Sequence, residues 1–308
     1  MRGLAGSPPK SNAVSRRRPP IFAGRRPRRP ASRRVVGLAV VAAALIAAAI
    51  ALRSALTVDK RGATVRHVTI ASRYVHRSLR ATLVQPAHAG SRPRPLLVFL
   101  HGRGDDGEDS NLHEELFAAL ARLGPRAPAI VFPDGGEHSY WHDRAGGAWG
   151  RYVMDEVIPM ALRELHADPR RVAIGGISMG GFGALDLARL HPGRFCAAGA
   201  HSPALWQTAG ETAAGAFDDA GDFARNDLIH LARTSPRAFA GQPLWLDAGH
   251  RDPFDAGDRA LVAALHDGGV RIEVHRWPGE HSGKYWRSHW GRYLDFYARA
   301  LERCGQAG

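Results

Sequence analysis

The chain has 308 residues, of which 44% are hydrophobic and 23% are charged. This composition is typical of a globular protein, and it excludes a collagen-like, fibrous or wholly disordered chain. Its two cysteines, Cys196 and Cys304, are too few for a disulfide framework or for a zinc site built from cysteines.

The formal net charge of +13 is concentrated at the amino terminus. Residues 1–34 hold eleven of the 42 Lys and Arg residues and no acidic residue, so 31 basic residues remain against 29 acidic ones. The rest of the chain is nearly neutral, and its charge gives no support to a nucleic-acid-binding domain. We therefore expect no nucleic-acid partner.

The amino-terminal region predicts a tail followed by a membrane segment. Residues 1–34 are rich in Arg and Pro and poor in apolar side chains, which indicates a disordered tail. Residues 35–52 carry no charge, and a helix of that length rises about 27 Å, close to the hydrocarbon thickness of a bilayer. Nine basic residues at 16–34, against four at 53–72, place the tail in the cytoplasm and the rest of the chain outside it.

The apolar segment has more than one interpretation. A cleaved signal peptide is the main alternative, because Arg33 and Arg34 precede the segment like a twin-arginine signal, and a buried core helix is a second. We favour an uncleaved anchor, because the segment is longer than a signal core and Arg53 follows it without a small-residue cleavage site. Both export interpretations place the protein outside the cytoplasm, anchored through residues 35–52 or secreted. Residues 53–63 are predicted to form a linker.

From residue 64 to residue 303, short apolar runs alternate with helical patterns, and residues 304–308 form a tail. The predicted strands are 65–70, 79–84, 95–100, 129–132, 171–174, 195–199, 243–247 and 270–276, and the predicted helices are 112–123, 152–165, 179–190, 258–266 and 284–301. The first two strands are expected to pair antiparallel, and the alternation predicts an α/β fold with a mostly parallel sheet covered on both faces. Residues 207–240 give no clear pattern, and we expect a cap over the sheet or a mobile insertion.

The strongest chemical signal is a G-x-S-x-G sequence centred on Ser178, between the strand 171–174 and the helix 179–190. A serine on such a tight turn is strained and exposed, and it lies at the positive end of the helix. Small neighbours are needed where the chains crowd, and the sequence supplies Gly175, Gly176, Gly180, Gly181 and Gly183. The alternative is a structural turn whose serine only caps the helix.

A serine nucleophile requires a base and an acid, which in this architecture follow it in the order carboxylate and then histidine. Asp252 lies in the loop after strand 243–247, and its rivals are Asp247, Asp255 and Asp258. His281 lies in the loop after strand 270–276. Of the other candidate bases, His275 is expected within a strand, His289 on the last helix and His250 beside the acid. The interpretation is a Ser178–His281–Asp252 triad.

An acyl transfer site also requires donors for the developing oxyanion. One predicted donor is the backbone N–H of Met179, directly after the nucleophile, and the other is the N–H of Arg103, in the loop after Leu100-His101-Gly102. His101 is interpreted as a loop-orienting residue. We also expect Tyr140, Trp141 and Asp143 to line the substrate cleft, with ordinary loop packing as the alternative.

Four segments resemble the putative-esterase branch of the α/β-hydrolase superfamily: residues 175–195, 100–106, 132–143 and 278–290. This branch includes esterase D (S-formylglutathione hydrolase), feruloyl-esterase-like enzymes and the antigen 85 mycolyltransferases. The resemblance implies the same three catalytic residues and the same two oxyanion donors, and its His-Ser-x-x-x-Trp pattern adds Trp286 to the expected substrate-binding residues. His101 replaces the acidic residue of antigen 85, which favours ester hydrolysis over mycolyl transfer.

The expected function is hydrolysis of a small-molecule or lipid carboxylic ester through an acyl-enzyme, outside the cytoplasm and without a cofactor or metal. A cell-envelope acyltransferase shares every catalytic residue and remains an alternative. A non-catalytic, membrane-tethered binding protein on a hydrolase scaffold is another. The sequence leaves open whether Cys196 pairs with Cys304, and the expected strand position of Cys196 favours a small buried side chain.

Overall fold

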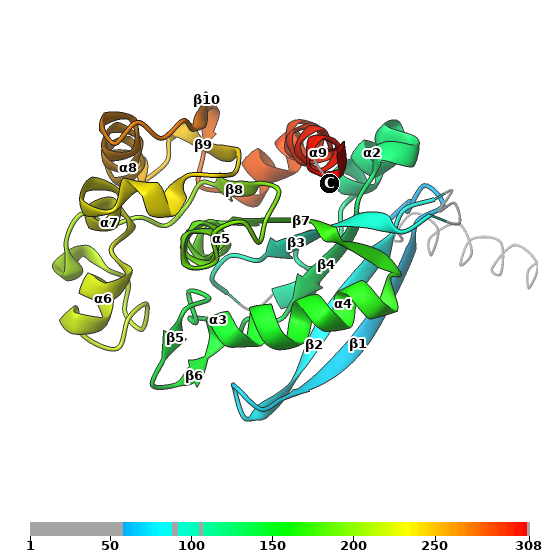
Figure 1. Ribbon diagram of the computed structural model, residues 1–308, viewed down its shortest axis with the longest axis horizontal. Helices are drawn as coiled ribbons and strands as arrows, with labels where there is room; N and C mark the ends of the chain where they lie inside the picture. Colours follow the sequence, from blue (N-terminus) through cyan, green and yellow to red (C-terminus); the bar gives the residue numbers. More distant parts are fainter. Residues whose placement is uncertain (1–57, 88–91, 105–106, 307–308) are drawn as a thin grey trace, which may run out of the picture. The chain divides into compact units, whose positions relative to one another are not determined.

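A computed structural model describes residues 58–87, 92–104 and 107–306 (Figure 1). The predicted tail, the apolar segment 35–52 and the first part of the linker lie outside these residues. Within the described residues, no helix combines the length and the apolar character needed to cross a bilayer. The membrane anchor therefore stays a prediction.

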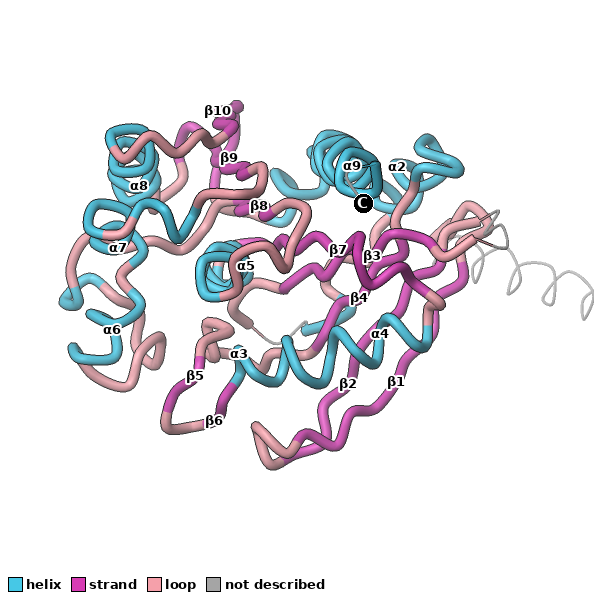
Figure 2. The backbone as a smooth tube through the Cα atoms, in the orientation of Figure 1, coloured by secondary structure: helices cyan, strands magenta, loops and turns pink. Residues whose placement is uncertain are grey.

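The described residues form an eight-stranded sheet in the order β1-β2-β4-β3-β7-β8-β9-β10 (Figures 1 and 2). Strand β2 pairs antiparallel with β1 and with β4, and the other neighbouring strands are parallel, which confirms the predicted mostly parallel sheet. The strands of this sheet are β1 (Thr64–Ser72), β2 (Arg77–Gln85), β3 (Arg94–Leu100), β4 (Ala129–Pro133), β7 (Ala167–Ile177), β8 (Ala198–His201), β9 (Leu244–Arg251) and β10 (Glu273–Glu280). A separate hairpin consists of β5 (Asp143–Arg144) and β6 (Gly147–Ala148).

Helices cover both faces of the sheet (Figure 1). The α-helices are α2 (Glu114–Leu123), α3 (Trp149–Arg151), α4 (Ile158–Glu164), α5 (Met179–Leu190), α6 (Ala220–Asn226), α7 (Leu228–Thr234), α8 (Asp255–Asp267) and α9 (Gly283–Gln306). Short 3₁₀ turns are η1 (Gly107–Asp109), η2 (Gly124–Arg126), η4 (Ala209–Glu211) and η5 (Pro236–Phe239). The segment η3 (Tyr152–Val157) is π-helical and joins α3 to α4.

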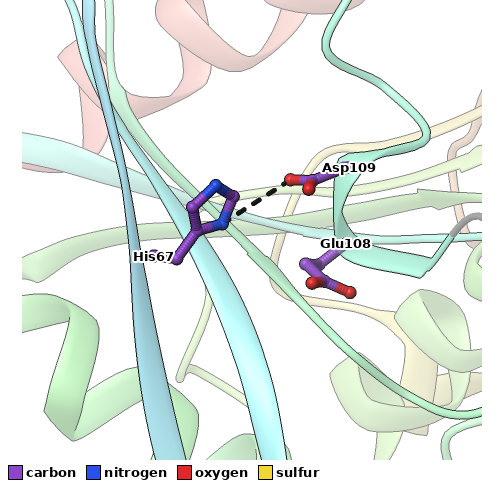
Figure 3. Close-up of side chains that lie close together, drawn as sticks. All are labelled: His67, Glu108 and Asp109. Carbon is purple, nitrogen blue, oxygen red and sulfur yellow. Dashed lines mark ion pairs between the residues drawn. The ribbon is translucent and has the colours of Figure 1, made fainter.

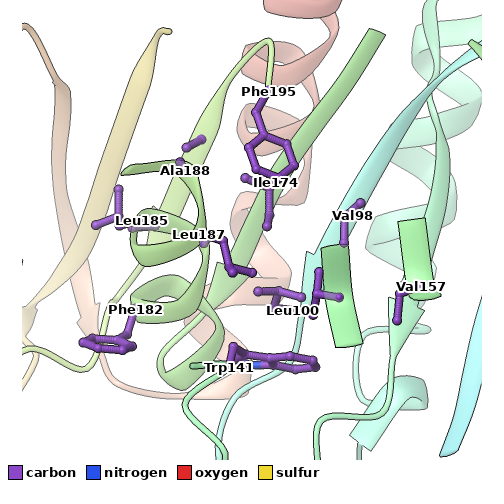
Figure 4. Close-up of a cluster of buried hydrophobic side chains, with 14 of the residues drawn as sticks. Val98, Leu100, Trp141, Val157, Ile174, Phe182, Leu185, Leu187, Ala188 and Phe195 are labelled. Carbon is purple, nitrogen blue, oxygen red and sulfur yellow. The ribbon is translucent and has the colours of Figure 1, made fainter. Parts of the chain in front are cut away.

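The central strand β3 shows how the core is divided between the two faces. All seven of its residues are buried, as expected for a parallel strand with helices on both sides. Leu97 and Phe99 pack with α2 and α9 in one hydrophobic cluster. Leu96, Val98 and Leu100 point to the opposite face, where α5 packs over Trp141 and its neighbours (Figure 4). The uninterrupted apolar run of this strand thus serves two cores.

Tertiary pairing moves several element boundaries away from their predicted positions. The predicted strand 270–276 lies at Glu273–Glu280, because its register follows β9, where Glu273 pairs with Trp245 and Glu280 with Arg251. The first six residues of the predicted helix 152–165 are π-helical η3, which ends two residues before Pro159, and only the following part is the α-helix α4. Proline lacks the N–H and crowds the preceding turn, and the wider π-helical turn accommodates it.

The two cysteines form a disulfide. Cys196 is buried, as expected, but its expected strand position is wrong, because β8 begins only at Ala198 and Cys196 lies in the preceding loop. Its partner Cys304 lies in the last turns of α9, since this helix continues to Gln306 instead of ending at residue 301. The disulfide fastens the end of α9 to the loop before β8.

The segment 207–240 is packed against the rest of the fold. His142 Nε2 lies 3.0 Å from Asp222 Oδ2, and both side chains are buried. Arg144 donates to Asp218 at 2.6 and 2.9 Å and also contacts the backbone of this segment. The segment is therefore fastened to the residues that follow β4 by one buried histidine–carboxylate hydrogen bond and one partly exposed ion pair.

Candidate active site

Ser178 lies on the sharp turn between β7 and α5, with φ 55° and ψ −113°. Its N–H donates to the carbonyl of His201 at 2.9 Å, and its own carbonyl accepts from Phe182 and Ala204. A Cβ on Gly180 would lie 2.0 Å from the Leu100 carbonyl oxygen, and a Cβ on Gly176 would lie 2.4 Å from the Gly180 backbone. The glycines of the motif are thus required by backbone contact, and the strained conformation at Ser178 is held from both sides.

Two neighbouring parallel strands deliver the acid and the histidine to this turn. Strand β9 ends at Arg251 and β10 ends at Glu280, and these two residues are paired. Asp252 and His281 follow them directly, so both leave the same edge of the sheet. His281 Nε2 lies 2.8 Å from Ser178 Oγ, and His281 Nδ1 lies 3.0 and 3.2 Å from the Asp252 carboxylate oxygens.

The protonation pattern of this group follows from its hydrogen bonds. An ionised carboxylate only accepts, so Nδ1 of His281 carries the proton and Nε2 is free to accept from the serine hydroxyl. Burial of Asp252 raises its pKa, but the hydrogen bond from His281, the positive charge of this ring when it is protonated, and the N–H of Phe254 together hold the pKa below the ordinary value. The imidazole ring is enclosed by Phe254 and Trp286, whose ring centroids lie 5.1 and 5.0 Å away.

The rival acids and bases lie elsewhere. Asp255 and Asp258 both form ion pairs with Arg276. His275 lies 2.9 Å from Glu273 within β10, His289 is bonded to the Tyr285 carbonyl on α9, and His250 is exposed near the end of β9 rather than in a loop. None of these three histidines is hydrogen-bonded to Ser178 within the described residues.

The two predicted oxyanion donors flank Ser178. Met179 is the first residue of α5, where the N–H has no acceptor in its own helix. Arg103 follows Gly102, and a Cβ on Gly102 would lie 3.4 Å from the Cβ of Ser178. Neither amide donates a hydrogen bond to any residue that the structure describes.

A cavity of about 1030 Å³ opens in front of Ser178 and His281. Most of its described wall comes from residues 101–104, 107–113, 137–140 and 281–287, and segment 207–240 contributes Ala213. Tyr140 and Trp286 line it as expected, whereas Trp141 and Asp143 do not. Trp141 is fully buried against Gly135 and Gly183, and the exposed Asp143 is bonded to Arg151. Assigning these two residues to the cleft wall was wrong, because core packing and a surface ion pair hold them.

A second histidine–carboxylate pair lies beneath the site and escaped the sequence analysis. His201 and Asp247 are fully buried, and their Nδ1 and Oδ1 atoms are 2.6 Å apart. Asp247 also accepts from Trp245, Tyr285 and Tyr293, and His201 Nε2 lies 2.9 Å from the hydroxyl of Tyr297. Gly175 and Gly199 leave room for that hydroxyl, since a Cβ on either would lie within 2.0 Å of it. Two glycines facing a tyrosine were the only signal available, and it is not specific.

One group of side chains brings potential metal ligands together: His67, Glu108 and Asp109 (Figure 3). Arg80 already pairs with both carboxylates, and Thr82 donates to Asp109 at 2.6 Å. With a guanidinium neutralising its acids, the group forms an ion-pair network beside the cavity, which Asp109 lines, rather than a set of free ligands.

The sequence of this chain is similar to a known family and to several curated proteins. A sequence model of the family described as "Putative esterase" matches residues 72–292. Among curated proteins, "Esterase MT1326" of Mycobacterium tuberculosis is 26% identical over 231 residues, covering 62% of this chain and 49% of that protein. The chain thus spans about half the length of that relative. "Diacylglycerol acyltransferase/mycolyltransferase Ag85A" of Mycobacterium bovis is 26% identical over 317 residues, covering 88% of this chain and 91% of that protein.

Solved structures share the fold. A ferulic acid esterase superposes with a TM-score of 0.67 at 22% identity, covering 77% of this chain and 98% of its own. An S-formylglutathione hydrolase from Agrobacterium tumefaciens superposes with a TM-score of 0.66 at 17% identity, covering 78% and 96%. These likenesses establish an α/β-hydrolase-like arrangement, as the sequence predicts.

Proposed function

Because the chain belongs to the putative esterase family, as its motifs predicted, we propose that it is a serine carboxylic ester hydrolase that acts through Ser178, His281 and Asp252. One observation carries the proposal: a continuous hydrogen-bonded series from the Ser178 hydroxyl, through both ring nitrogens of His281, to the Asp252 carboxylate. The Ser178 end of the series faces a large open cavity, and the backbone amides of Arg103 and Met179 near Ser178 donate to no residue that the structure describes. This is the combination that acyl transfer requires.

The proposed reaction has two acyl-transfer steps. Ser178 Oγ attacks the ester carbonyl carbon while His281 Nε2 takes its proton, and the carbonyl oxygen becomes an alkoxide bonded by the amides of Arg103 and Met179. His281 then protonates the departing alcohol, which leaves an acyl-serine. Water enters, gives a proton to His281 and attacks the acyl carbon, and the carboxylic acid departs as the proton returns to Ser178. Asp252 holds the imidazole in the required tautomer throughout.

Substitution Ser178→Ala tests the proposal. We expect hydrolysis of short p-nitrophenyl esters to fall by about 10⁴-fold or more, because the nucleophile is removed. Labelling by a fluorophosphonate probe should disappear with it. Ser288→Ala is the matched control, since this hydroxyl donates to a carbonyl within α9 and its residue is exposed. Activity retained in Ser178→Ala would refute the mechanism, and a wild-type protein that the probe does not label would favour the non-catalytic alternative.

An acyltransferase is the second candidate, favoured by the alignment with Ag85A, which spans 88% of this chain and 91% of that relative. It uses the same residues and differs only in the nucleophile that enters second. Product analysis with a sugar or a lipid alcohol present separates the two, because an acyltransferase forms a new ester in place of the free acid.

We also propose that the enzyme works outside the cytoplasm, with residues 35–52 as anchor. The apolar segment, the basic residues before it and the Cys196–Cys304 disulfide support this, since structural disulfides persist in oxidising compartments. A fusion of alkaline phosphatase after residue 63 should be active in cells, and membrane fractions should retain it. An inactive fusion contradicts export, and release into the medium indicates a cleaved signal.

A further inference from the structure

The side chain of His101 is buried in the wall behind Ser178, and both of its ring nitrogens are hydrogen-bonded. Nε2 lies 2.9 Å from the backbone nitrogen of Gly135, and Nδ1 lies 2.6 Å from the carbonyl oxygen of Gly102. A backbone N–H only donates and a carbonyl only accepts. Nε2 therefore carries a lone pair and Nδ1 carries the proton, which fixes a single neutral tautomer. Burial lowers the pKa of His101 and favours the same neutral form.

The carbonyl that His101 binds belongs to the peptide unit that carries the Arg103 N–H. In a trans peptide the C=O and N–H bonds point in opposite directions from one rigid plane. A hydrogen bond that holds the Gly102 oxygen toward the buried ring therefore turns the Arg103 N–H away from it. Gly102 itself contacts Ser178, because its added Cβ would lie 3.4 Å from the Ser178 Cβ. The Arg103 N–H has no acceptor among the described residues.

Other contacts keep the ring in place. The Trp141 indole N–H donates to the His101 carbonyl at 3.3 Å, and the indole meets the imidazole edge-on with ring centroids 5.1 Å apart. Trp141 in turn lies against Gly135, whose N–H is the donor to Nε2. The core tryptophan and the turn at Gly135 thus contact the imidazole and each other, which holds in place the ring that binds the Gly102 carbonyl.

We propose that His101 is a positioning residue that orients the Arg103 amide as an oxyanion donor. The inference rests on the proposed esterase function and goes beyond it by assigning the residue that presets the donor. His101 makes no contact with the reacting atoms and moves no proton, since both ring nitrogens are already engaged. Its contribution is preorganisation: the donor is aimed before the substrate arrives, so no reorientation is needed when charge develops on the carbonyl oxygen.

A pair of amide substitutions separates the two ring nitrogens. The side-chain nitrogen of His101→Asn occupies the position of Nδ1 and keeps the donor to the Gly102 carbonyl. The longer side chain of His101→Gln reaches the position of Nε2 with its oxygen, so it keeps the acceptor for Gly135 and loses the donor to Gly102. We expect kcat to fall about 10²–10³-fold in His101→Gln, the usual effect of losing one oxyanion donor, with KM little changed. The variant His101→Asn should keep most of the wild-type kcat, because it retains the donor to the Gly102 carbonyl.

Inhibitor binding distinguishes positioning from a general disturbance of the fold. A trifluoromethyl ketone forms an oxyanion adduct with the serine, so its affinity should fall in His101→Gln by the same factor as kcat/KM. The affinity of a product carboxylate should not change. Equal losses of kcat in both variants, or an unchanged ketone affinity in His101→Gln, would overturn the proposal. Thermal unfolding of each variant shows whether its fold is intact.

A measurement on the unaltered enzyme covers the case in which neither variant folds. In wild-type protein with ¹⁵N-labelled arginine, the Arg103 amide proton should move downfield when the ketone adduct forms, because it gains a charged acceptor. An unmoved resonance overturns the inference. The outcomes also separate it from the proposed function: activity in Ser178→Ala refutes the triad, whereas an inactive Ser178→Ala with a fully active His101→Gln refutes only the role of His101.

Discussion

Two histidine–carboxylate pairs belong to neighbouring strands of the same sheet, one pair within β8 and β9 and the other directly after β9 and β10, and they differ in what the second ring nitrogen meets. In His281–Asp252, Nε2 faces the Ser178 hydroxyl at 2.8 Å beside the cavity. In His201–Asp247, Nε2 faces the Tyr297 hydroxyl at 2.9 Å in the core. The residue types match, so the imidazole–carboxylate pair is not what distinguishes a catalytic site from a structural one.

The surroundings of the two carboxylates account for the difference. Asp247 has no exposed surface and accepts from two tyrosines and a tryptophan in addition to His201, so its charge is satisfied by fixed donors. The Asp252 side chain is equally buried, but the groups that stabilise its charge are His281, the Phe254 N–H and the Ser202 hydroxyl, with no tyrosine or tryptophan among them. The inner pair, His201–Asp247, therefore ties β8 and β9 to α9. The outer pair, His281–Asp252, leaves its imidazole facing a hydroxyl and solvent. We expect substitutions in the outer pair to lower activity and substitutions in the inner pair to lower stability.

The largest expected effect comes from Asp252→Asn. The amide favours the wrong imidazole tautomer and does not stabilise the imidazolium, so kcat should fall by about 10⁴-fold with a small change in KM. Steady-state kinetics on a p-nitrophenyl ester measures the loss, and circular dichroism checks the fold. A kcat within tenfold (~1.4 kcal/mol) of wild type would show that another group serves as the acid.

Asp247→Asn should act on stability instead. Its amide cannot satisfy four donors, and each buried donor left without an acceptor costs about 1–3 kcal/mol of the free energy of unfolding. Urea denaturation measures this cost. The folded fraction should keep a kcat close to wild type, because the atoms of the outer pair are untouched. A large loss of kcat in fully folded protein would mean that the inner pair takes part in catalysis, and the contrast between the two pairs would fail.

Tyr297→Phe is the mildest variant. It removes the hydroxyl bonded to His201 and leaves the ring in place, so we expect a loss of about 1–3 kcal/mol in unfolding free energy for a buried group left unsatisfied. Activity should not change. A double-mutant cycle with Asp247→Asn measures the coupling within the inner pair, and additive effects would show that the tyrosine acts independently of the carboxylate.

The positions around Ser178 were predictable because they follow from chain order and sheet topology. Carboxyl ends of parallel strands meet at one edge, so an acid after β9 and a histidine after β10 had to emerge near the turn that carries Ser178. The predicted wall of the cleft was only half correct. Tyr140 and Trp141 are adjacent in sequence, yet one faces the cavity and the other fills the core between Gly135 and Gly183.

The inner pair and the disulfide lay beyond sequence reasoning for a related reason. His201 lies 46 positions from Asp247 and 96 positions from Tyr297, and each of the three is unremarkable in its own segment. Cys196 and Cys304 are 108 positions apart, and their pairing depends on how far α9 extends along the sheet. Contacts of this kind are decided by how helices pack on a sheet, and local patterns do not encode packing.

Local chemistry was sufficient for the alternation of strands and helices, the glycine-flanked serine turn and the order serine, aspartate, histidine. Periodicity and backbone sterics act over a few residues, so one sequence reveals them. Which imidazole meets the hydroxyl, which is sealed beneath tyrosines and which orients a backbone amide was decided only by the folded structure. Distance and burial, rather than residue type, assign those roles, and both arise from the packing of segments far apart in the chain.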